Sequence, residues 1–315
     1  MTTPLRCVLL STTLDLARHF GPVLAEVADV IEAVPHPVAE GAGDVPMALA
    51  WFPPADAFAQ YPNLRAVCSI AAGVDSLLAC PGLPPDVAVV RVVDPDQARA
   101  MSCFVLWHVI GHQRRFRTYA ENQARAAWRP LGQRPAGEIT VGLLGYGRMG
   151  AQVAADLAAL GFTVLAWSRS ERPPEAAVAH HHGAEGLAAL LARTDVLVNL
   201  LPLTPETKGI LDASLFRRLK PGATLVQVGR GAHLVEADLL AALDDGPLGA
   251  AALDVFAVEP LPEAHPFWRH PKIVVTPHEA CDASPQAVAA MLRATATALR
   301  AGEPIPHAVD RGRGY

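Results

Sequence analysis

Three polar residues in the second half of the chain have side chains that together could move a proton next to an anion. His278 has an imidazole whose ordinary pKa, about 6.5, lets it hold and release a proton near neutral pH. A carboxylate such as Glu259 can orient that ring and raise its pKa, and Arg230 offers a fixed positive charge whose planar fork suits a carboxylate. Taken singly, the three residues equally fit a core imidazole, an exposed loop acid and a surface ion pair.

A glycine-rich turn lies between an apolar segment, 139–144, and an Ala-rich segment, 151–160. It consists of Gly145, Tyr146, Gly147, Arg148, Met149 and Gly150, which is the spacing GxGxxG. The first glycine permits a tight turn, the second lets the backbone approach a pyrophosphate, and the third lets a helix pack close to the strand. In a strand–turn–helix setting this motif predicts dinucleotide binding. A plain glycine-rich turn and a methyltransferase-type nucleotide site are the alternatives.

The next apolar segment, 163–167, is followed by Ser168, Arg169 and Ser170. An NAD enzyme usually has an acidic residue there for the ribose hydroxyls. A carboxylate would repel a 2′-phosphate, whereas a guanidinium with flanking hydroxyls can bind one. The segment therefore favours NADP(H), with NAD(H) as the second choice, and a solvated loop with an incidental arginine is the alternative.

The elements that would position these groups are short β-rich segments alternating with Ala/Leu-rich helical stretches, which predicts an α/β fold with mainly parallel sheets. Strands are expected at 7–10, 47–51, 66–69 and 87–91 in a first lobe, and at 140–144, 163–167, 196–200, 224–228, 249–253 and 273–276 in a second. Helices of the second lobe are expected to begin near Gly147, Leu187, Asp212 and Glu236. Arg230, Glu259 and His278 then follow three successive strands, at the edge where doubly wound sheets bind ligands.

The two lobes are predicted to be interleaved along the chain. A Pro-containing turn near 94–98 precedes a long helical stretch, 98–127, and an amphipathic helix near 284–299 is expected to return to the first lobe. We therefore predict a Rossmann-type dinucleotide-binding domain, 98–283, inserted into a smaller flavodoxin-like substrate and catalytic domain, 1–97 and 284–315.

Composition excludes several other classes of protein. The 315 residues carry a formal net charge of −5 without long runs of like charge, which argues against nucleic acid and anionic membranes as partners. The N-terminus lacks the features of a secretory signal, and no apolar run reaches the roughly 18 residues of a membrane span. The five cysteines are scattered and never spaced CxxC, which favours neither disulfides nor zinc and predicts a reducing cytoplasm.

Taken in order, these motifs and the segment 201–210 resemble the D-2-hydroxyacid dehydrogenase family over essentially the whole chain. Segments 72–76 and 167–170 and the ending 309–315 are most similar to the glyoxylate/hydroxypyruvate reductases of that family. The resemblance implies NADPH-linked reduction of glyoxylate or hydroxypyruvate by a homodimer. Hydride delivery to a keto carbon builds negative charge on the carbonyl oxygen, which His278 would protonate and Arg230 would stabilise.

The resemblance also implies residues for each ligand. The substrate would contact Trp51, Arg230 and the backbone of Ala72, Gly73 and Val74. Besides the glycine turn and 168–170, the cofactor would contact Leu201, Pro202, Leu203, Thr207, Val228, Gly229, Asp254 and His278, with Asp254 near the carboxamide. No metal is expected.

Four features depart from the family pattern or invite another interpretation. Gln227 stands where Asn is usual, and Glu279 follows the histidine where a small or apolar residue is common. We expect Glu279 to point away from the site, because it would repel an anionic substrate. The run His180-His181-His182 is expected on an exposed loop rather than at a metal site, since no carboxylate or cysteine is spaced to complete one. The basic stretch 114–117 is expected on a helix face at a dimer interface or in solvent.

Two other functions fit the same fold. A catalytically silent NADP(H)-binding sensor or corepressor-like protein would keep the cofactor lobe without turnover, against which the set Arg230, Glu259 and His278 argues. A dehydrogenase of a larger D-2-hydroxy acid would keep the chemistry, and the lack of an added regulatory domain weighs against it.

Overall fold

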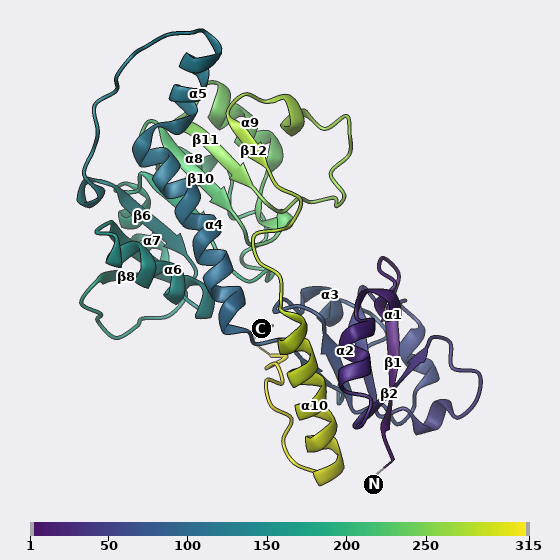
Figure 1. The fold of residues 1–315 in the computed structure, drawn as a ribbon. Helices are drawn as coiled ribbons and strands as arrows, with labels where there is room; N and C mark the ends of the chain where they lie inside the picture. The colour runs from purple at the N-terminus through teal and green to yellow at the C-terminus, as the bar shows by residue number, and fades with distance from the viewer. Residues whose placement is uncertain (1–2, 313–315) are drawn as a thin grey trace. The chain divides into compact units, whose positions relative to one another are not determined.

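The computed structural model describes residues 3–312, which form two compact units (Figure 1). One unit runs to Gln97 and resumes at Asp282, and the other is Ala98–Cys281. Each is built on a parallel sheet with helices, so the predicted α/β class is confirmed. Arg313, Gly314 and Tyr315 of the predicted C-terminal motif lie outside the described residues.

The first unit has, within the described chain, a five-stranded parallel sheet of order β2-β1-β3-β4-β5, the flavodoxin-like order. Its strands are β1 (Leu5–Ser11), β2 (Ile31–Pro35), β3 (Met47–Trp51), β4 (Ala66–Ser69) and β5 (Ala88–Val90). The sequence interpretation was wrong in omitting β2. This strand lies at the edge of the sheet and buries only Ile31 and Val34, so its apolar signal is short.

Helices α1 (Leu16–His19), α2 (Gly21–Glu26), α3 (Asp75–Leu78) and α10 (Pro285–Ala301) belong to the same unit. The side chain of Ser284 caps α10 by accepting a hydrogen bond from Ala287 N–H, and its own N–H donates to Asp94. Along α10, Val288 and Leu292 are fully buried in a core shared with residues of β1 and β3. The C-terminal helix therefore packs on the sheet formed by the first part of the chain.

The second unit has, among its described residues, a seven-stranded parallel sheet of order β12-β11-β10-β9-β6-β7-β8. Its strands are β6 (Thr140–Leu144), β7 (Thr163–Ser168), β8 (Val178–His182), β9 (Val196–Asn199), β10 (Ala223–Gln227), β11 (Leu248–Leu253) and β12 (Ile273–Val275). The run 180–182 thus ends an edge strand, which corrects the predicted loop. The run also has a carboxylate nearby, since Glu175 Oε1 lies 3.4 Å from His180 Nε2. The sequence interpretation had expected no carboxylate partner for these histidines.

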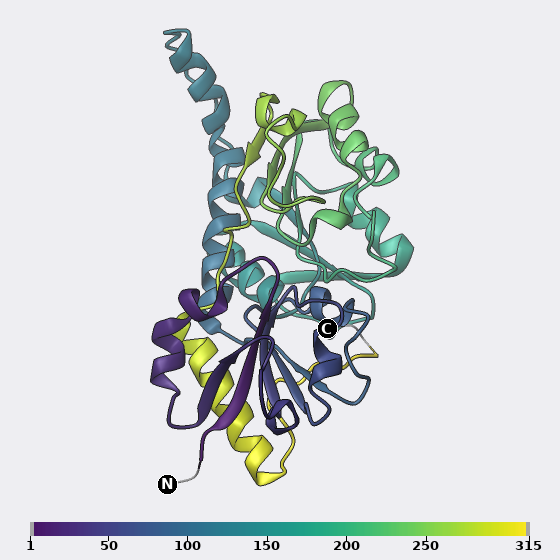
Figure 2. The ribbon, with the colours of Figure 1, turned by 90° about the vertical axis from the view of Figure 1, so that its right-hand side faces the viewer.

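The helices of this unit are α4 (Pro95–Arg114), which begins at the junction with the first unit, α5 (Phe116–Ala124), α6 (Arg148–Ala159), α7 (Gly183–Leu191), α8 (Ala213–Phe216) and α9 (Glu236–Asp244). Short 3-10 helices lie at Ala42–Asp44 and Ala57–Gln60 in the first unit, and at Ala136–Glu138, Gly231–His233 and Pro266–Arg269 in the second. The predicted single stretch 98–127 is two helices, because Arg115 has a φ of 57°. The basic stretch 114–117 therefore does not form one helix face, and Figure 2 shows the far end of α5 pointing away from the rest of the unit.

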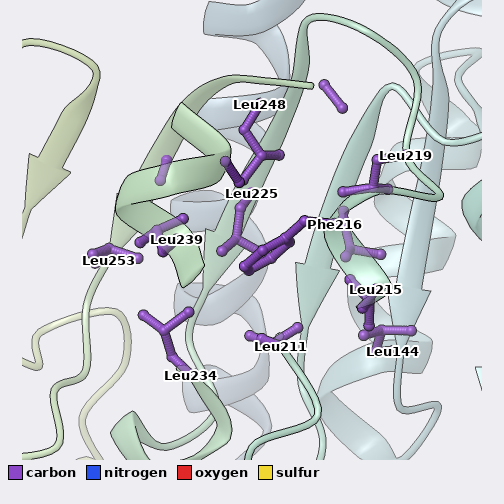
Figure 3. Packing of buried hydrophobic residues seen from close by; sticks show 14 of the residues in the cluster. Leu144, Leu211, Leu215, Phe216, Leu219, Leu225, Leu234, Leu239, Leu248 and Leu253 are labelled. Carbon is purple, nitrogen blue, oxygen red and sulfur yellow. The ribbon is translucent and has the colours of Figure 1, made fainter. Parts of the chain in front are cut away.

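Leucine-rich packing holds the seven-stranded sheet. Phe216, Leu225 and Leu239 lie together in the core on one side of the sheet (Figure 3). Burying one such side chain stabilises the fold by about 1.5–3 kcal/mol. The packing fixes the carboxyl ends of the strands, from which the loops with the candidate site residues depart.

The connections of this sheet reverse direction between β6 and β9. From β6 the chain proceeds outward to β7 and β8, whereas β9 begins the series that ends at β12. In such sheets ligands bind outside the carboxyl ends of the strands at this switch point. None of the helices formed within residues 3–312 is long and apolar enough to cross a bilayer.

Candidate active site

The glycine turn follows β6 at the switch point, and its glycines meet different surroundings. Gly145 has a φ of +100°, and a Cβ there would lie 2.9 Å from the carbonyl carbon of Leu200. A Cβ on Gly150 would collide with the carbonyl oxygen of Gly145. In contrast, a Cβ on Gly147 would meet no atom within 4 Å. The protein's own packing requires the first and third glycines, and the open side of Gly147 leaves room for a ligand to approach the backbone.

Helix α6 begins at Arg148 directly after Gly147, and no side chain caps its first turn. Free N–H groups at a helix N-terminus suit a phosphate. The Tyr146 ring, by contrast, is buried and its hydroxyl donates to Glu175. The backbone of the turn, rather than the tyrosine side chain, is therefore the part suited to a pyrophosphate.

Ser168 ends β7, next to the glycine turn in the sheet. Its hydroxyl donates to the carbonyl of Ser170 at 2.8 Å, and Arg169 is exposed. The positive charge of Arg169 helps to lower the pKa of Glu206, which is lowered chiefly by a hydrogen bond from Thr204. Arg169 therefore acts electrostatically on the loop after β9.

A buried pair of amides joins the ends of β9 and β10. Asn199 Nδ2 donates to Gln227 Oε1 at 2.8 Å, and Gln227 Nε2 donates to the carbonyl of Arg230 at 2.8 Å. Both amide side chains are fully buried. Gln227, which departs from the family pattern, thus fixes the backbone that carries Arg230.

A second set of contacts joins the Arg230 loop to the loop after β9. Arg230 N–H donates to His233 Nδ1 at 3.0 Å, and His233 Nε2 lies 3.2 Å from the carbonyl of Pro202. A Cβ on Gly231 would collide with the backbone of Phe256. These contacts hold the Arg230 loop against the loop after β9 and against the backbone of Phe256. The sequence interpretation missed His233, whose only signal was a polar residue soon after the arginine.

His278 and Glu259 form an ion pair. His278 Nδ1 lies 2.8 Å from Glu259 Oε2, and Glu259 Oε1 accepts from Phe256 N–H at 2.9 Å. The hydrogen bond to Glu259 raises the pKa of His278, against the opposite effect of burial. Burial would raise the pKa of Glu259, but the hydrogen bonds from His278 and from Phe256 lower it overall. The pair thus stabilises the protonated imidazole and leaves Nε2 as the ring nitrogen without that bond.

Asp254, directly after β11, holds the backbone around His278. His278 has a φ of 60°, in the left-handed region that residues other than glycine adopt only uncommonly. The Asp254 carboxylate accepts hydrogen bonds from Thr276 Oγ1 at 2.6 Å, from Glu279 N–H at 2.9 Å and from Ala280 N–H at 3.0 Å. The side chain predicted to lie near the carboxamide therefore binds the turn of His278. Glu279 itself is exposed.

Other predicted cofactor contacts lie on two loops at the same edge of the sheet. Leu201, Pro202, Leu203 and Thr207 follow β9, and Val228 and Gly229 follow β10. Within the first of these loops, the Thr207 hydroxyl donates to the carbonyl of Pro202 at 2.7 Å. The second unit thus gathers all the predicted cofactor residues with Arg230 and Glu259.

The predicted substrate residues Trp51, Ala72, Gly73 and Val74 lie in the first unit. Trp51 ends β3, and the loop with the other three follows β4. Ser69 orders this loop, because its hydroxyl donates to the carbonyl of Gly73 and accepts from Ala71 N–H. In the part of the chain that the structure describes, no group of three or more His, Cys, Asp or Glu side chains could hold a metal.

Comparison with known proteins identifies the family. Residues 106–280 match the family model described as D-isomer specific 2-hydroxyacid dehydrogenase, NAD binding domain. The chain belongs to this family. It is 46% identical over 273 residues to a glyoxylate/hydroxypyruvate reductase A of Serratia proteamaculans, covering 85% of this chain and 87% of the relative. A protein of the same name from Yersinia enterocolitica is 41% identical with the same coverage.

Solved structures of this dehydrogenase family share the fold. A D-isomer specific 2-hydroxyacid dehydrogenase from Xanthobacter autotrophicus Py2, in complex with NADPH and MES, is 38% identical with a TM-score of 0.91, covering 98% of this chain and 99% of that one. An NADPH-dependent glyoxylate/hydroxypyruvate reductase from Sinorhizobium meliloti, in complex with NADP and sulfate, is 37% identical with a TM-score of 0.90 and the same coverage. The resemblance first recognised in the motifs is confirmed.

Proposed function

We propose that this dehydrogenase reduces a small 2-keto acid, of the glyoxylate and hydroxypyruvate class, to the 2-hydroxy acid with NADPH. The observation that carries the proposal is the ion pair of His278 and Glu259, 2.8 Å apart, at the sheet edge that also carries Arg230 and the glycine turn. The names of the relatives from Serratia and Sinorhizobium support the substrate class and the cofactor.

The residues at the switch point fit NADP(H). The open side of Gly147 and the uncapped start of α6 suit the pyrophosphate, and Arg169 without a neighbouring acid at 168–170 suits a 2′-phosphate. When bound, the nicotinamide supplies the hydride that adds to the carbonyl carbon of the substrate.

His278 acts as the general acid of this reaction. As the carbonyl carbon gains its hydride, the oxygen gains the proton from Nε2, which yields the 2-hydroxy acid and a neutral imidazole. Glu259 keeps the ring oriented and protonated beforehand, and the half-exposed ring regains a proton from water. Arg230 stabilises the negative charge that develops on the oxygen.

Recognition of the substrate carboxylate selects a 2-keto acid over a plain ketone. The guanidinium of Arg230 is suited to it by its planar fork. The backbone of Ala72, Gly73 and Val74, with Trp51, supplies the contacts of the first unit in this proposal.

The test mixes the purified protein with NADPH and a panel of 2-keto acids and follows NADPH absorbance, with NADH in parallel. Oxidation of NADPH by glyoxylate or hydroxypyruvate is expected. Binding of NADPH without turnover of any keto acid would favour the sensor alternative, and preference for a bulky keto acid would favour the dehydrogenase of a larger substrate.

We further propose a homodimer in the cytoplasm. The α4–α5 region and the loop after it expose large aromatic side chains, with Trp107 63%, Phe116 53% and Trp128 96% exposed. Apolar surface of this kind is typical of a protein–protein interface. Sedimentation of the wild type and of Trp107→Glu tests the oligomeric state, and a wild type that sediments as a monomer contradicts the proposed homodimer.

A further inference from the structure

The glycine turn is tied by its tyrosine to the segment 169–177 that follows β7. The Tyr146 hydroxyl donates to Glu175 Oε2 at 2.6 Å. Tyr146 as a whole is buried, with 7% of its surface exposed. Arg172 lies over the same ring, with Cζ 5.2 Å from its centroid, and the ring of His180 lies edge-on at 4.6 Å. One side chain of the turn thus contacts three residues in or next to this segment.

Tyr146 keeps its hydroxyl proton at neutral pH. Burial, and then the hydrogen bond to Glu175, raise the pKa of Tyr146 to about 12. The hydrogen bond from Tyr146 lowers the pKa of Glu175, and the charges of His180 and Arg172 lower it further. The contact therefore joins a neutral donor to an ionised acceptor, which is stronger than a bond between neutral groups.

Few other contacts hold the segment: Ser168 Oγ donates to the carbonyl of Ser170 at its start, and Glu175 forms a β-bridge with Val178 and lies 3.4 Å from His180 at its end. Every residue of 169–177 is exposed, and Pro173 and Pro174 have no N–H to donate. It nevertheless carries Arg169 and Arg172. The segment directly follows β7, the second strand of this unit, and a Rossmann sheet contacts the ribose 2′ substituent after its second strand. The contacts of Glu175 and Arg172 with Tyr146 therefore hold the middle of this segment, between the two ends that the sheet fixes, against the glycine turn.

We propose that Tyr146, acting through Glu175, is a positioning residue that selects dinucleotides bearing a 2′-phosphate. It holds the segment 169–177 against the glycine turn, so that Arg169 and Arg172 meet the phosphate in place. The inference rests on the proposed preference for NADP(H). It assigns the tyrosine side chain to cofactor selection, whereas the backbone of the turn serves the pyrophosphate common to both cofactors.

The decisive variant is Tyr146→Phe, which removes the hydroxyl and keeps the ring under Arg172 and beside His180. Dissociation constants for NADPH and NADH are measured by the quenching of tryptophan fluorescence, so that no turnover is needed. The Kd for NADPH is expected to rise about tenfold, the effect of one charge-assisted hydrogen bond, while the Kd for NADH is unchanged.

Two variants of Glu175 separate the hydrogen bond from the charge. Glu175→Gln keeps an acceptor for Tyr146 but removes its charge, so its Kd for NADPH is expected to rise less than that of Tyr146→Phe, whereas Glu175→Ala is expected to behave like Tyr146→Phe. Tyr119→Phe is the matched control, because it removes a hydroxyl that accepts from Leu131 N–H at 3.1 Å in the same unit. It is expected to change neither constant.

The proposal is overturned if Tyr146→Phe leaves the Kd for NADPH unchanged or weakens NADPH and NADH equally, since equal weakening is the mark of a residue that only supports the fold. These results would leave the proposed reduction intact if the wild type still prefers NADPH. A wild type that binds both cofactors equally would instead refute the cofactor preference itself, and the inference with it.

Discussion

The loops that carry the proposed catalytic residues Arg230, Glu259 and His278, called the catalytic loops below, lie at the same edge of the seven-stranded sheet as the segment 169–177. The two regions are built differently. Behind the catalytic loops stand Asp254, 1% exposed, and Gln227, fully buried, whose polar atoms bind the loop backbones. The segment 169–177 is exposed throughout and is bound to the glycine turn through the side chain of Tyr146.

The difference matches what each region has to do. A proton donor must be held within a fraction of an ångström of its acceptor, which favours buried, fully bonded supports. A region that selects between two cofactors needs only a charge at the right place, and an exposed loop can change that charge without disturbing the core. Changes in the catalytic loops should therefore affect turnover, and changes in the segment 169–177 should affect the choice of cofactor.

The largest effect is expected for His278→Asn. The variant keeps a polar side chain but cannot donate a proton as an imidazolium does, so reduction of the keto acid should fall about 10²- to 10⁴-fold. NADPH binding, measured by fluorescence, should stay normal because the glycine turn is untouched. His270→Asn, which changes a histidine paired with Asp244 in the same unit, serves as the control. Near-normal turnover would remove His278 from the mechanism.

Arg230→Lys should be the next most damaging change. Lysine keeps the positive charge but loses the planar fork, so kcat/KM for the keto acid should fall about 10²-fold or more. The Kd for NADPH should change little, which steady-state kinetics and binding measured side by side would reveal. An effect confined to NADPH binding would contradict the division between the two regions.

The sequence was most informative about strands that lie in the middle of a sheet. The strands β6, β9 and β10 were recognised because their continuous apolar runs are buried on both faces, as in β9, where all four residues are buried. The edge strands β2 and β8 were missed, since they bury few residues; β8 buries Val178 but exposes Ala179 and His182. Periodicity could not separate such strands from loops.

The supports of the site were harder to predict than its candidate residues. Arg230 and His278 stand in recognisable motifs after strands, so they could be named as candidates from spacing. The bond from Asn199 to Gln227, in contrast, depends on β9 and β10 being neighbours in the sheet. Likewise, Asp254 could not be connected with the turn of His278 before its backbone conformation was known.

The pH dependence of turnover tests the ion pair itself. His278 must carry its proton to act as the acid, so kcat/KM for reduction should fall as pH rises through the His278 pKa. Glu259 raises that pKa, with a smaller contribution from Asp254 and an opposing one from Arg230, so the fall should lie above the ordinary value of about 6.5. In Glu259→Gln the fall should move to lower pH, and activity at neutral pH should drop about tenfold. A pH profile identical to that of the wild type would show that the pair does not set the proton affinity.

The smallest effect is expected in the exposed segment. Arg169→Ala removes a guanidinium from a solvated position, where screening weakens its attraction for a phosphate, so the Kd for NADPH should rise only about fivefold to tenfold. The Kd for NADH and kcat at saturating NADPH should not change, because neither depends on the 2′-phosphate. Arg218→Ala is the matched control, since this exposed arginine precedes β10 and so lies toward the opposite edge of the sheet. If Arg169→Ala lowers kcat instead, the segment takes part in catalysis and the contrast between the two regions fails.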